Sequence, residues 1–147
     1  TNFNDLSEEQ QEKVGRMAGV LETFKAAEEY VFVTPLWNFG VPPMLKAYMD
    51  NVLITGETFK YTEVGPVGLL DNKKATIIQA SGGVYSSGPA ASMEHGSNHL
   101  KTLLGFMGVH DVSTILLEGV AIPDKSEEEK LDGFLKLVDD LLEPELV

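Results

Sequence analysis

The sequence predicts an open α/β domain, with a doubly wound parallel sheet in a three-layer α/β/α arrangement. Three short apolar segments, at residues 30–34, 75–80 and 112–118, are typical of strands buried in a parallel sheet. Segments with the apolar periodicity of helices separate them. Strands that alternate with helices are joined by right-handed crossovers, and such crossovers produce a parallel sheet.

The composition limits the classes of function. The chain has 147 residues, the size of one domain, with 11 basic and 23 acidic residues and a net charge of -12. Nucleic acids and anionic membranes bind basic surfaces, so neither is an expected partner. The absence of cysteine excludes disulfides and thiolate chemistry. With no signal peptide and no apolar run long enough to cross a bilayer, a cytoplasmic protein is expected.

Four helices are expected around these strands. The first spans residues 5–28, because Ser7 and Gln10 form a capping box ahead of an apolar repeat. The second runs from about residue 42 to Gly56, the third from about residue 90 to Gly108, and the fourth follows a second capping box at residues 126–129. The apolar stripes are Val14, Met17, Leu21 and Phe24; Met44, Leu45, Tyr48, Met49, Val52 and Leu53; Met93, Leu100, Leu103, Leu104, Phe106 and Met107; and Leu131, Phe134, Leu135, Val138, Leu141 and Leu142.

A short excursion separates the second helix from the second strand. Residues 58–62 alternate polar and aromatic side chains, as strands do. A segment rich in Gly and apolar residues follows at 65–70. Together the two segments predict a hairpin-like arm.

The predicted sheet is narrow for this architecture. It has three strands, and the sequence starts on a helix, whereas doubly wound domains usually start on a strand. We therefore expect at least one N-terminal βα unit, of roughly 30 residues or more, to be missing. Residues 1–147 are then a single domain that forms the C-terminal part of a longer one. The edge of the sheet needs a covering segment or partner.

Two loops, at residues 35–39 and 81–88, each follow a predicted buried strand. Parallel strands end at the same edge of a sheet, so both loops can reach one ligand there. In the first loop Trp37 and Phe39 offer aromatic walls and Asn38 offers polar contacts, as in a site for a flat ligand. The alternative is that Trp37 fills the core.

The second loop is the most Gly- and Ser-rich part of the chain. Gly82 and Gly83 allow the backbone to approach a ligand closely, and their amides can face an anionic or electron-rich edge. The alternative is an ordinary turn, because Gly/Ser clusters are general loop signals. The pairing with an aromatic loop favours the site.

Other chemistries are not indicated. His95 and His99 lie four residues apart on the predicted third helix, beside Glu94, which resembles half a metal site or a polar helix face. The spacing does not match His-Glu-x-x-His and no further His or Cys cluster follows, so no metal is expected. The serines of residues 81–87 lack the Gly-x-Ser-x-Gly elbow of serine hydrolases. No Walker A or Gly-x-Gly-x-x-Gly loop is present.

Several motifs together resemble one family. Residues 35–50 read Pro-Leu-Trp-Asn-Phe-Gly-Val-Pro-Pro-Met-Leu-Lys-Ala-Tyr-Met-Asp and residues 56–62 read Gly-Glu-Thr-Phe-Lys-Tyr-Thr. With Gly-Gly-Val-Tyr at 82–85 and Leu-Gly-Phe-Met-Gly-Val at 104–109, they closely resemble the FMN-dependent NADH-azoreductases. These are flavodoxin-like enzymes related to NAD(P)H quinone reductases. The resemblance runs from about Ser7 to Gly119.

The resemblance implies an FMN site on the two loops. Residues 36–39 would wrap the isoalloxazine ring and residues 80–83 would line its other side, with Tyr85 nearby. Tyr61 and Phe106 would approach the flavin of a partner subunit in a homodimer. The cofactor-binding residues implied are Pro35, Leu36, Trp37, Asn38, Phe39, Ala80, Ser81, Gly82, Gly83 and Tyr85. No catalytic side chain is expected, because the chemistry takes place on FMN.

The sequence departs from the family at the phosphate. In the family, serines in the loop after the first strand bind the FMN phosphate, and that strand, its loop and the next strand have no counterpart here. A phosphate bound by backbone amides and a helix N-terminus is a large part of such a site. The ring-binding half is therefore expected in this chain without the phosphate-binding half.

The function implied is hydride transfer from NADH or NADPH through FMN to quinones or azo compounds. One alternative is a flavodoxin-like module that binds flavin or transfers electrons without turning over a substrate. Another is a truncated scaffold that has lost the cofactor. The aromatic residues of the arm favour a substrate pocket over a simple electron carrier.

Overall fold

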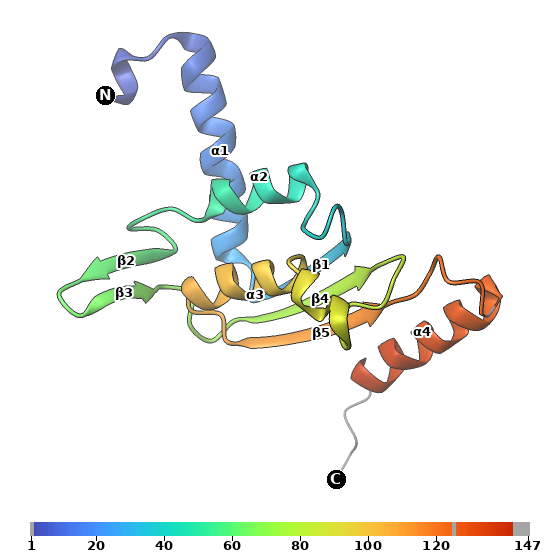
Figure 1. The fold of residues 1–147 in the computed structure, drawn as a ribbon. Coiled ribbons are helices and arrows are strands. Elements are labelled where there is room, and N and C mark those ends of the chain that lie inside the picture. Colours follow the sequence, from blue (N-terminus) through green and yellow to red (C-terminus); the bar gives the residue numbers. More distant parts are fainter. Residues whose placement is uncertain (1, 125, 143–147) are drawn as a thin grey trace. The chain divides into compact units, whose positions relative to one another are not determined.

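The computed structural model describes residues 2–124 and 126–142, which form two compact units. One, here called the arm unit, comprises the residues up to Tyr30, Pro43–Lys74 and Leu103–Asp111. The other, here called the sheet unit, comprises Val31–Pro42, Ala75–Thr102 and the residues from Val112 onward. Figure 1 shows the course of the chain through both.

The sheet has the three predicted strands. They are β1 (Glu29–Pro35), β4 (Lys74–Ala80) and β5 (Asp111–Leu117), in the order β1-β4-β5. Figure 1 shows all three running in the same direction, so the predicted parallel sheet is confirmed. The loops that follow β1 and β4 therefore leave the sheet at the same edge.

The strand β1 differs from expectation in its burial. Its side chains alternate between buried and exposed, and Val31 and Val33 are 62% and 75% exposed. The prediction that this apolar run is covered on both faces is therefore wrong for the residues that the structure describes. The reason is that described residues cover only the face of β1 that carries Tyr30, Phe32 and Thr34.

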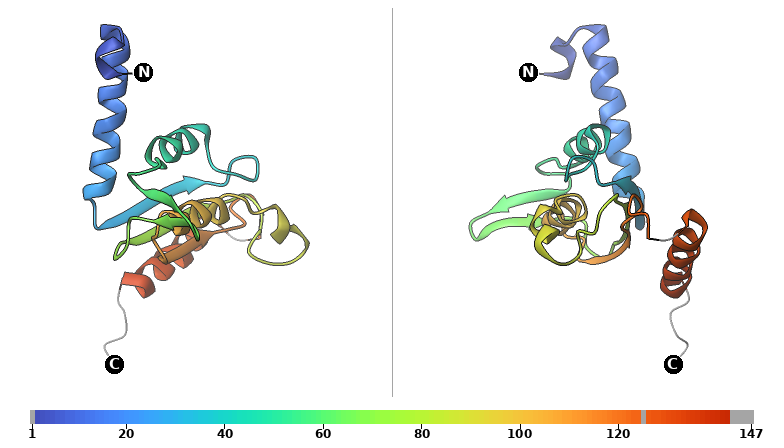
Figure 2. Two further views of the ribbon diagram at one scale, coloured as in Figure 1. Left: turned by 90° about the vertical axis from the view of Figure 1, so that its left-hand side faces the viewer. Right: turned by 45° about the vertical axis from the view of Figure 1, so that its right-hand side comes forward.

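Helices lie on both sides of the sheet. Successive residues of β4 point to opposite faces. Gln79 faces the segment that leads into α3 (Ser97–Phe106), because its side chain donates to Glu94, and Ile78 shares an apolar pocket with Phe134 of α4 (Glu127–Leu142). Figure 2 shows α3 and α4 apart on the two sides.

The third predicted helix begins later than expected. A 3-10 helix, η2 (Pro89–Met93), comes first. Residues 94–96 are not helical, and this break in the helical conformation separates η2 from α3. The predicted capping box at the start of α4 is confirmed, since the amide of Ser126 donates to Glu129 and the amide of Glu129 donates to the Ser126 hydroxyl. Only part of the α4 stripe is covered, because Leu131 and Leu135 are exposed. Leu141 and Leu142 of that stripe lie outside the residues whose side chains are described.

The arm unit opens with η1 (Phe3–Asp5) and α1 (Glu8–Ala26). The capping box of Ser7 and Gln10 is confirmed. The apolar stripe is buried only in its second half, at Leu21 and Phe24.

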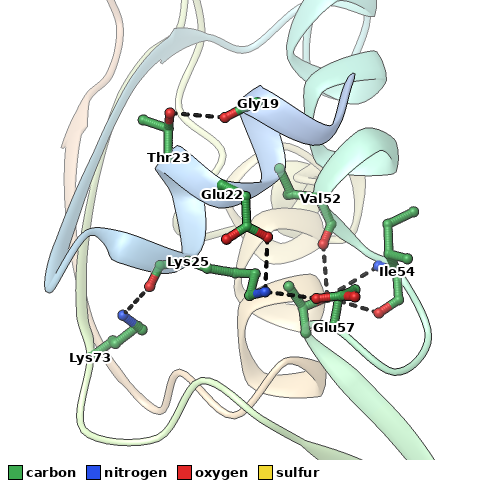
Figure 3. Close-up of polar contacts among 9 residues, drawn as sticks. Gly19, Glu22, Thr23, Lys25, Val52, Ile54, Glu57 and Lys73 are labelled. Carbon is green, nitrogen blue, oxygen red and sulfur yellow. Dashed lines mark hydrogen bonds and ion pairs between the residues drawn. The ribbon is translucent and has the colours of Figure 1, made fainter. Parts of the chain in front are cut away.

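The C-terminal end of α1 is fixed by two lysines (Figure 3). The Lys73 ammonium donates to the backbone carbonyls of Lys25, at 2.8 Å, and of Ala27. A cation suits the end of a helix, where carbonyls lack partners. The side chain of Lys25 pairs with Glu57, at 2.7 Å, and with Glu22, at 3.0 Å.

The helix α2 (Pro43–Val52) ends before Gly56. The Thr58 hydroxyl, which is fully buried, donates to the carbonyl of Val52 at 2.7 Å. The Thr58 side chain thus provides a hydrogen-bond partner for a carbonyl at the end of α2, whereas the sequence predicted that the helix would end at Gly56. Gly56 instead lies in the following turn, with φ of 87°.

The predicted arm is a β-hairpin of β2 (Phe59–Thr62) and β3 (Gly65–Gly68), paired antiparallel. Its base packs closely on the turn that follows α3, where a Cβ at Gly68 would lie 2.2 Å from the amide nitrogen of Gly108. A side chain at Gly68 is therefore excluded.

Candidate functional site

The aromatic loop closes into a two-residue turn. Trp37 and Gly40 exchange both backbone hydrogen bonds, at 2.8 and 2.9 Å, and the residues between them, Asn38 and Phe39, have φ of 46° and 67°. Positive φ at both central positions is the type I′ geometry. Asn adopts it readily, but for an aromatic residue it costs about 1–2 kcal/mol. Strain of this kind is typical of functional sites.

The turn presents its side chains outward. Trp37 is 57% exposed, so the alternative that it fills the core is wrong. The ring of Phe39 meets the ring of Tyr85 edge to face, with centroids 6.0 Å apart. The aromatic loop is thus an open surface joined to the second loop by a ring contact.

The second loop is shaped by the end of β5. Ser81 is buried, and its amide donates to the carbonyl of Leu117 at 2.8 Å. The carboxylate of Glu118 accepts from the amides of Tyr85, at 2.6 Å, and Ser86, at 2.7 Å, and from the Ser86 hydroxyl. Sequence analysis did not identify Glu118, since its partners lie 32 and 33 residues away and it belongs to no motif.

The two loops converge on one pocket, as predicted. It has a volume of about 230 Å³, and six predicted site residues line it: Leu36, Asn38, Phe39, Ser81, Gly82 and Tyr85. Pro35 and Ala80 line a neighbouring apolar pocket of about 330 Å³ between the sheet and α4. A side chain at Gly83 would place its Cβ 3.2 Å from the Tyr85 ring, so the ring covers this glycine.

Several backbone amides of the two loops have no partner among the described residues. Within the part of the chain that the structure describes, the amides of Asn38, Phe39, Gly82 and Gly83 donate to no protein atom. Apolar and aromatic walls with several unpaired N–H groups suit a flat ligand whose edge carries hydrogen-bond acceptors.

Tyr61 and Phe106 belong to the arm unit. Tyr61 is 70% exposed and packs edge to face on Phe59, with ring centroids 5.6 Å apart. Phe106 packs on the same ring at 4.7 Å. The expectation that both residues approach a partner's flavin stays a prediction.

The two histidines do not share a helix face. His95 lies in the break before α3 and His99 lies within that helix, so this expectation is wrong. Across residues 2–124 and 126–142, no three His, Asp or Glu side chains gather as a metal site would need. In the same residues, no helix combines the length and apolar character needed to cross a bilayer.

Comparison with known proteins identifies the family. The model of a family described as having a flavodoxin-like fold matches residues 1–141. The chain belongs to this flavodoxin-like family. The strand order and the loops at the sheet edge described above agree with that membership.

Relatives of this flavodoxin-like chain include named oxidoreductases. It is 60% identical over 129 residues to an FMN-dependent NADH:quinone oxidoreductase 3 of Bacillus cereus, an alignment that covers 87% of this chain and 61% of that protein. It is 50% identical over 137 residues to FMN-dependent NADH:quinone oxidoreductase 2 of Bacillus subtilis (strain 168), covering 92% and 65%. The chain therefore spans about three fifths of the length of the relative it matches in Bacillus cereus.

Comparison with solved structures supports the same family. An FMN-dependent NADH-azoreductase from Bacillus anthracis str. Ames Ancestor, in complex with FMN, superposes with a TM-score of 0.87 at 40% identity. The superposition covers 92% of this chain and 64% of that one. The resemblance inferred from the sequence motifs is confirmed.

Proposed function

We propose that this chain carries the isoalloxazine-binding part of an FMN-dependent oxidoreductase that passes a hydride from NADH or NADPH to quinones and azo compounds. The observation that carries the proposal is the pocket between the loops after β1 and β4. Its unpaired amides and aromatic walls occur in a chain that is 60% identical to an FMN-dependent NADH:quinone oxidoreductase.

The residues present fit the ring of FMN. Its isoalloxazine system is flat and apolar on its faces, with carbonyl oxygens and ring nitrogens along its edges. The amides of the two loops supply donors for such acceptors, and Leu36, Phe39 and Tyr85 supply apolar contact. The volume of about 230 Å³ lies below the roughly 300–1,000 Å³ of complete small-molecule sites. It suits a part of the cofactor rather than the whole.

The residues that line the pocket do not fit the phosphate of FMN as they fit its ring. No Lys, Arg or His lines the pocket among the described residues. The serine loop that binds the phosphate in the family has no counterpart in this sequence. In the proposal this chain supplies the ring contacts, and phosphate binding needs residues that this sequence does not contain.

The protein's part in the reaction is positioning and electrostatics. FMN, when bound, supplies the redox chemistry by accepting and donating a hydride. The unpaired amides of Asn38, Phe39, Gly82 and Gly83 would stabilise negative charge at the ring edge, since fixed donors need no rearrangement. The rings of Phe39 and Tyr85 would limit water beside it. No residue is required as an acid or base.

Three further statements belong to the proposal. The protein acts as a homodimer in the cytoplasm, and Tyr61 and Phe106 line the substrate pocket at the dimer interface. The support is the family resemblance together with the exposure of Tyr61 and its ring contact through Phe59.

The test is an FMN titration of the full-length protein, followed by visible absorbance and by melting temperature. We expect a bound flavin spectrum, stabilisation by FMN, and NADH oxidation when a quinone is added. Asn38→Gly keeps the positive φ of the turn but removes the amide side chain, and Gly83→Val fills the space against Tyr85; both should weaken FMN binding.

The matched control is Asn4→Ala, an exposed asparagine of η1, which should leave FMN binding unchanged. A folded protein that FMN neither colours nor stabilises would favour the scaffold alternative. A flavoprotein that does not oxidise NADH with a quinone would favour the electron-transfer module. FMN binding that is unaffected by both site variants would disprove the assignment of the pocket.

A further inference from the structure

Glu94 is a buried carboxylate outside the pocket. It is 6% exposed and lies in the break between η2 and α3. One oxygen accepts from the Gln79 side chain at 3.0 Å and from the amides of Gly96 at 3.0 Å and Ser97 at 2.8 Å. The other accepts from the Ser97 hydroxyl at 3.0 Å and the Asn98 amide at 3.2 Å.

These contacts keep the carboxylate ionised. Burial alone would raise the pKa of Glu94, but the hydrogen bonds from Gln79, Ser97 and Asn98 outweigh it and lower the pKa below its ordinary value of 4.5. The amides belong to the N-terminus of α3, whose dipole also favours a negative charge.

The carboxylate also fixes Gln79. Because a carboxylate only accepts hydrogen bonds, it selects the orientation in which the amide nitrogen of Gln79 faces it. Gln79 is 2% exposed, and its oxygen has no partner among the described residues. That oxygen lies close to Gly96, where a Cβ would be only 2.2 Å away. Strand β4 and the 94–96 segment are thus joined tightly at this point.

The same segment supports the aromatic loop. The amide of His95 donates to the carbonyl of Phe39 at 2.9 Å. A Cβ at Gly96 would lie 2.8 Å from Leu36 Cδ1, so the Leu36 side chain packs on this glycine. The amide of Leu36 in turn donates to Ala80, the residue after Gln79, at 2.7 Å. Leu36, just before the turn, and Phe39, within it, are therefore both held by the 94–96 segment, and Leu36 is also held by β4.

We propose that Glu94 is a positioning residue for the flavin ring, which it sets by fixing residues 94–96 and Gln79 behind the loop that carries Leu36 and Phe39. The proposal rests on the function proposed above. Glu94 lines no part of the pocket and touches no ligand; it acts through the Phe39 carbonyl, the Leu36 side chain and the α3 N-terminus.

The test compares Glu94→Gln with the wild type in the full-length protein. The substituted amide has one acceptor oxygen, and its NH₂ group faces amides that are themselves donors. We expect hydrogen exchange at the bonded amides of Trp37, Gly40 and His95 to accelerate in the ligand-free protein. The dissociation constant of FMN should rise about tenfold, the equivalent of about 1.4 kcal/mol. The fluorescence of Trp37, the only tryptophan, should shift as its turn loosens.

The matched control is Glu129→Gln. Glu129 also caps a helix, α4, where its carboxylate accepts from the amide and the hydroxyl of Ser126. Its exchange rates at Trp37, Gly40 and His95 and its FMN affinity should equal those of the wild type. If Glu94→Gln lowers the melting temperature while both readouts stay at wild-type values, Glu94 only stabilises α3 and the proposal is overturned.

Two provisions keep the test decisive. If Glu94→Gln does not fold, Gln79→Met removes the bond to β4 while leaving the α3 amides capped. Faster exchange at Trp37, Gly40 and His95 supports the proposal, and unchanged exchange overturns it. If the wild type does not bind FMN at all, the proposed function fails. Exchange in the ligand-free proteins then still decides whether Glu94 fixes the loop.

Discussion

The Trp37–Gly40 turn closes on itself, whereas the loop at residues 81–86 takes its shape from a carboxylate 32 or 33 residues further along the chain. The turn needs two mutual hydrogen bonds and two positive φ angles, all within four residues.

The 81–86 loop has one internal bond, from the Ser81 hydroxyl to the carbonyl of Gly83 at 2.8 Å, but its other described bonds go to residues at the end of β5 or after it. Besides Glu118, the amides of Gly119 and Ala121 donate to the carbonyls of Gly83, at 3.0 Å, and Gly82, at 3.1 Å. These bonds use the carbonyls of the two glycines, whose N–H groups have no partner among the described residues. The first wall of the pocket, the Trp37–Gly40 turn, is therefore strained and closed by its own hydrogen bonds. The second wall, the 81–86 loop, is relaxed and depends on residues far along the chain.

The difference predicts how each wall fails. A substitution in the turn acts where it is made, on strain and on side chains that face a ligand. A substitution at the end of β5 should disorder the second wall without touching a ligand.

The largest effect is expected from Glu118→Ala. It removes a charged acceptor from the amides of Tyr85 and Ser86, and the loss should lower the free energy of unfolding by about 2–3 kcal/mol. The affinity for FMN should fall at least about tenfold. Urea denaturation and a flavin titration measure the two quantities.

The control for Glu118→Ala is Glu63→Ala, an exposed carboxylate between β2 and β3. It should change the free energy of unfolding by no more than about 0.5 kcal/mol. If FMN affinity survives Glu118→Ala unchanged, the glycines shape the second wall by themselves and the comparison of the two loops is wrong.

The same contrast explains what the sequence could predict. Predictions from short sequence patterns were correct, because the cause of each feature lies within a few residues. Both capping boxes, the three strands and the hairpin arm are confirmed. The order of strands and helices then placed two loops at one edge, and six of the ten residues expected to bind the cofactor line one pocket there.

The features that the sequence did not predict depend on contacts between residues far apart in the chain. The break at residues 94–96 interrupts a segment with a helical pattern, because Glu94 bonds to Gln79 on β4 as well as to the first amides of α3. The exposure of Val31 and Val33 depends on what packs against their face of β1 rather than on the apolar run itself. Glu118 had no signal, since an isolated acidic residue after a strand is ordinarily solvated.

An intermediate effect is expected from a fall in pH, which protonates the carboxylate of Glu94 behind the first wall. The pKa of Glu94 is lowered in the folded protein, so its stabilisation is complete above the ordinary value of 4.5 and is lost as pH falls through the folded-state pKa. Each unit of difference between the two pKa values is worth about 1.4 kcal/mol. The turn that rests on Glu94 should therefore loosen in acid.

The measurement is the fluorescence of Trp37 between about pH 6 and about pH 3, alongside the free energy of unfolding over the same range. The wild type should show a change in emission with a midpoint below 4.5, and Glu94→Gln should lack it. An identical transition in both proteins would assign the change to other carboxylates.

The smallest effect on stability, and the sharpest test of strain, is expected from Phe39→Asn. Asn adopts positive φ more easily than Phe, which recovers part of the 1–2 kcal/mol or so of backbone strain. The loss of the edge-to-face contact with Tyr85 lowers stability by about 0.5–1.5 kcal/mol, which offsets this gain. The free energy of unfolding should therefore stay within about 1 kcal/mol of the wild type, while FMN binding weakens.

The matched control for Phe39→Asn is Asn72→Gly, at an exposed position of the arm unit whose φ is 60°. It changes a residue with the same backbone geometry and should leave FMN binding unaltered. If Phe39→Asn instead lowers stability by several kcal/mol, the aromatic ring is part of the core and the turn is not strained for the sake of a ligand. If it leaves stability and FMN binding both unchanged, the strained residue has no part in the pocket, and the first wall consists of Leu36 and the turn amides alone.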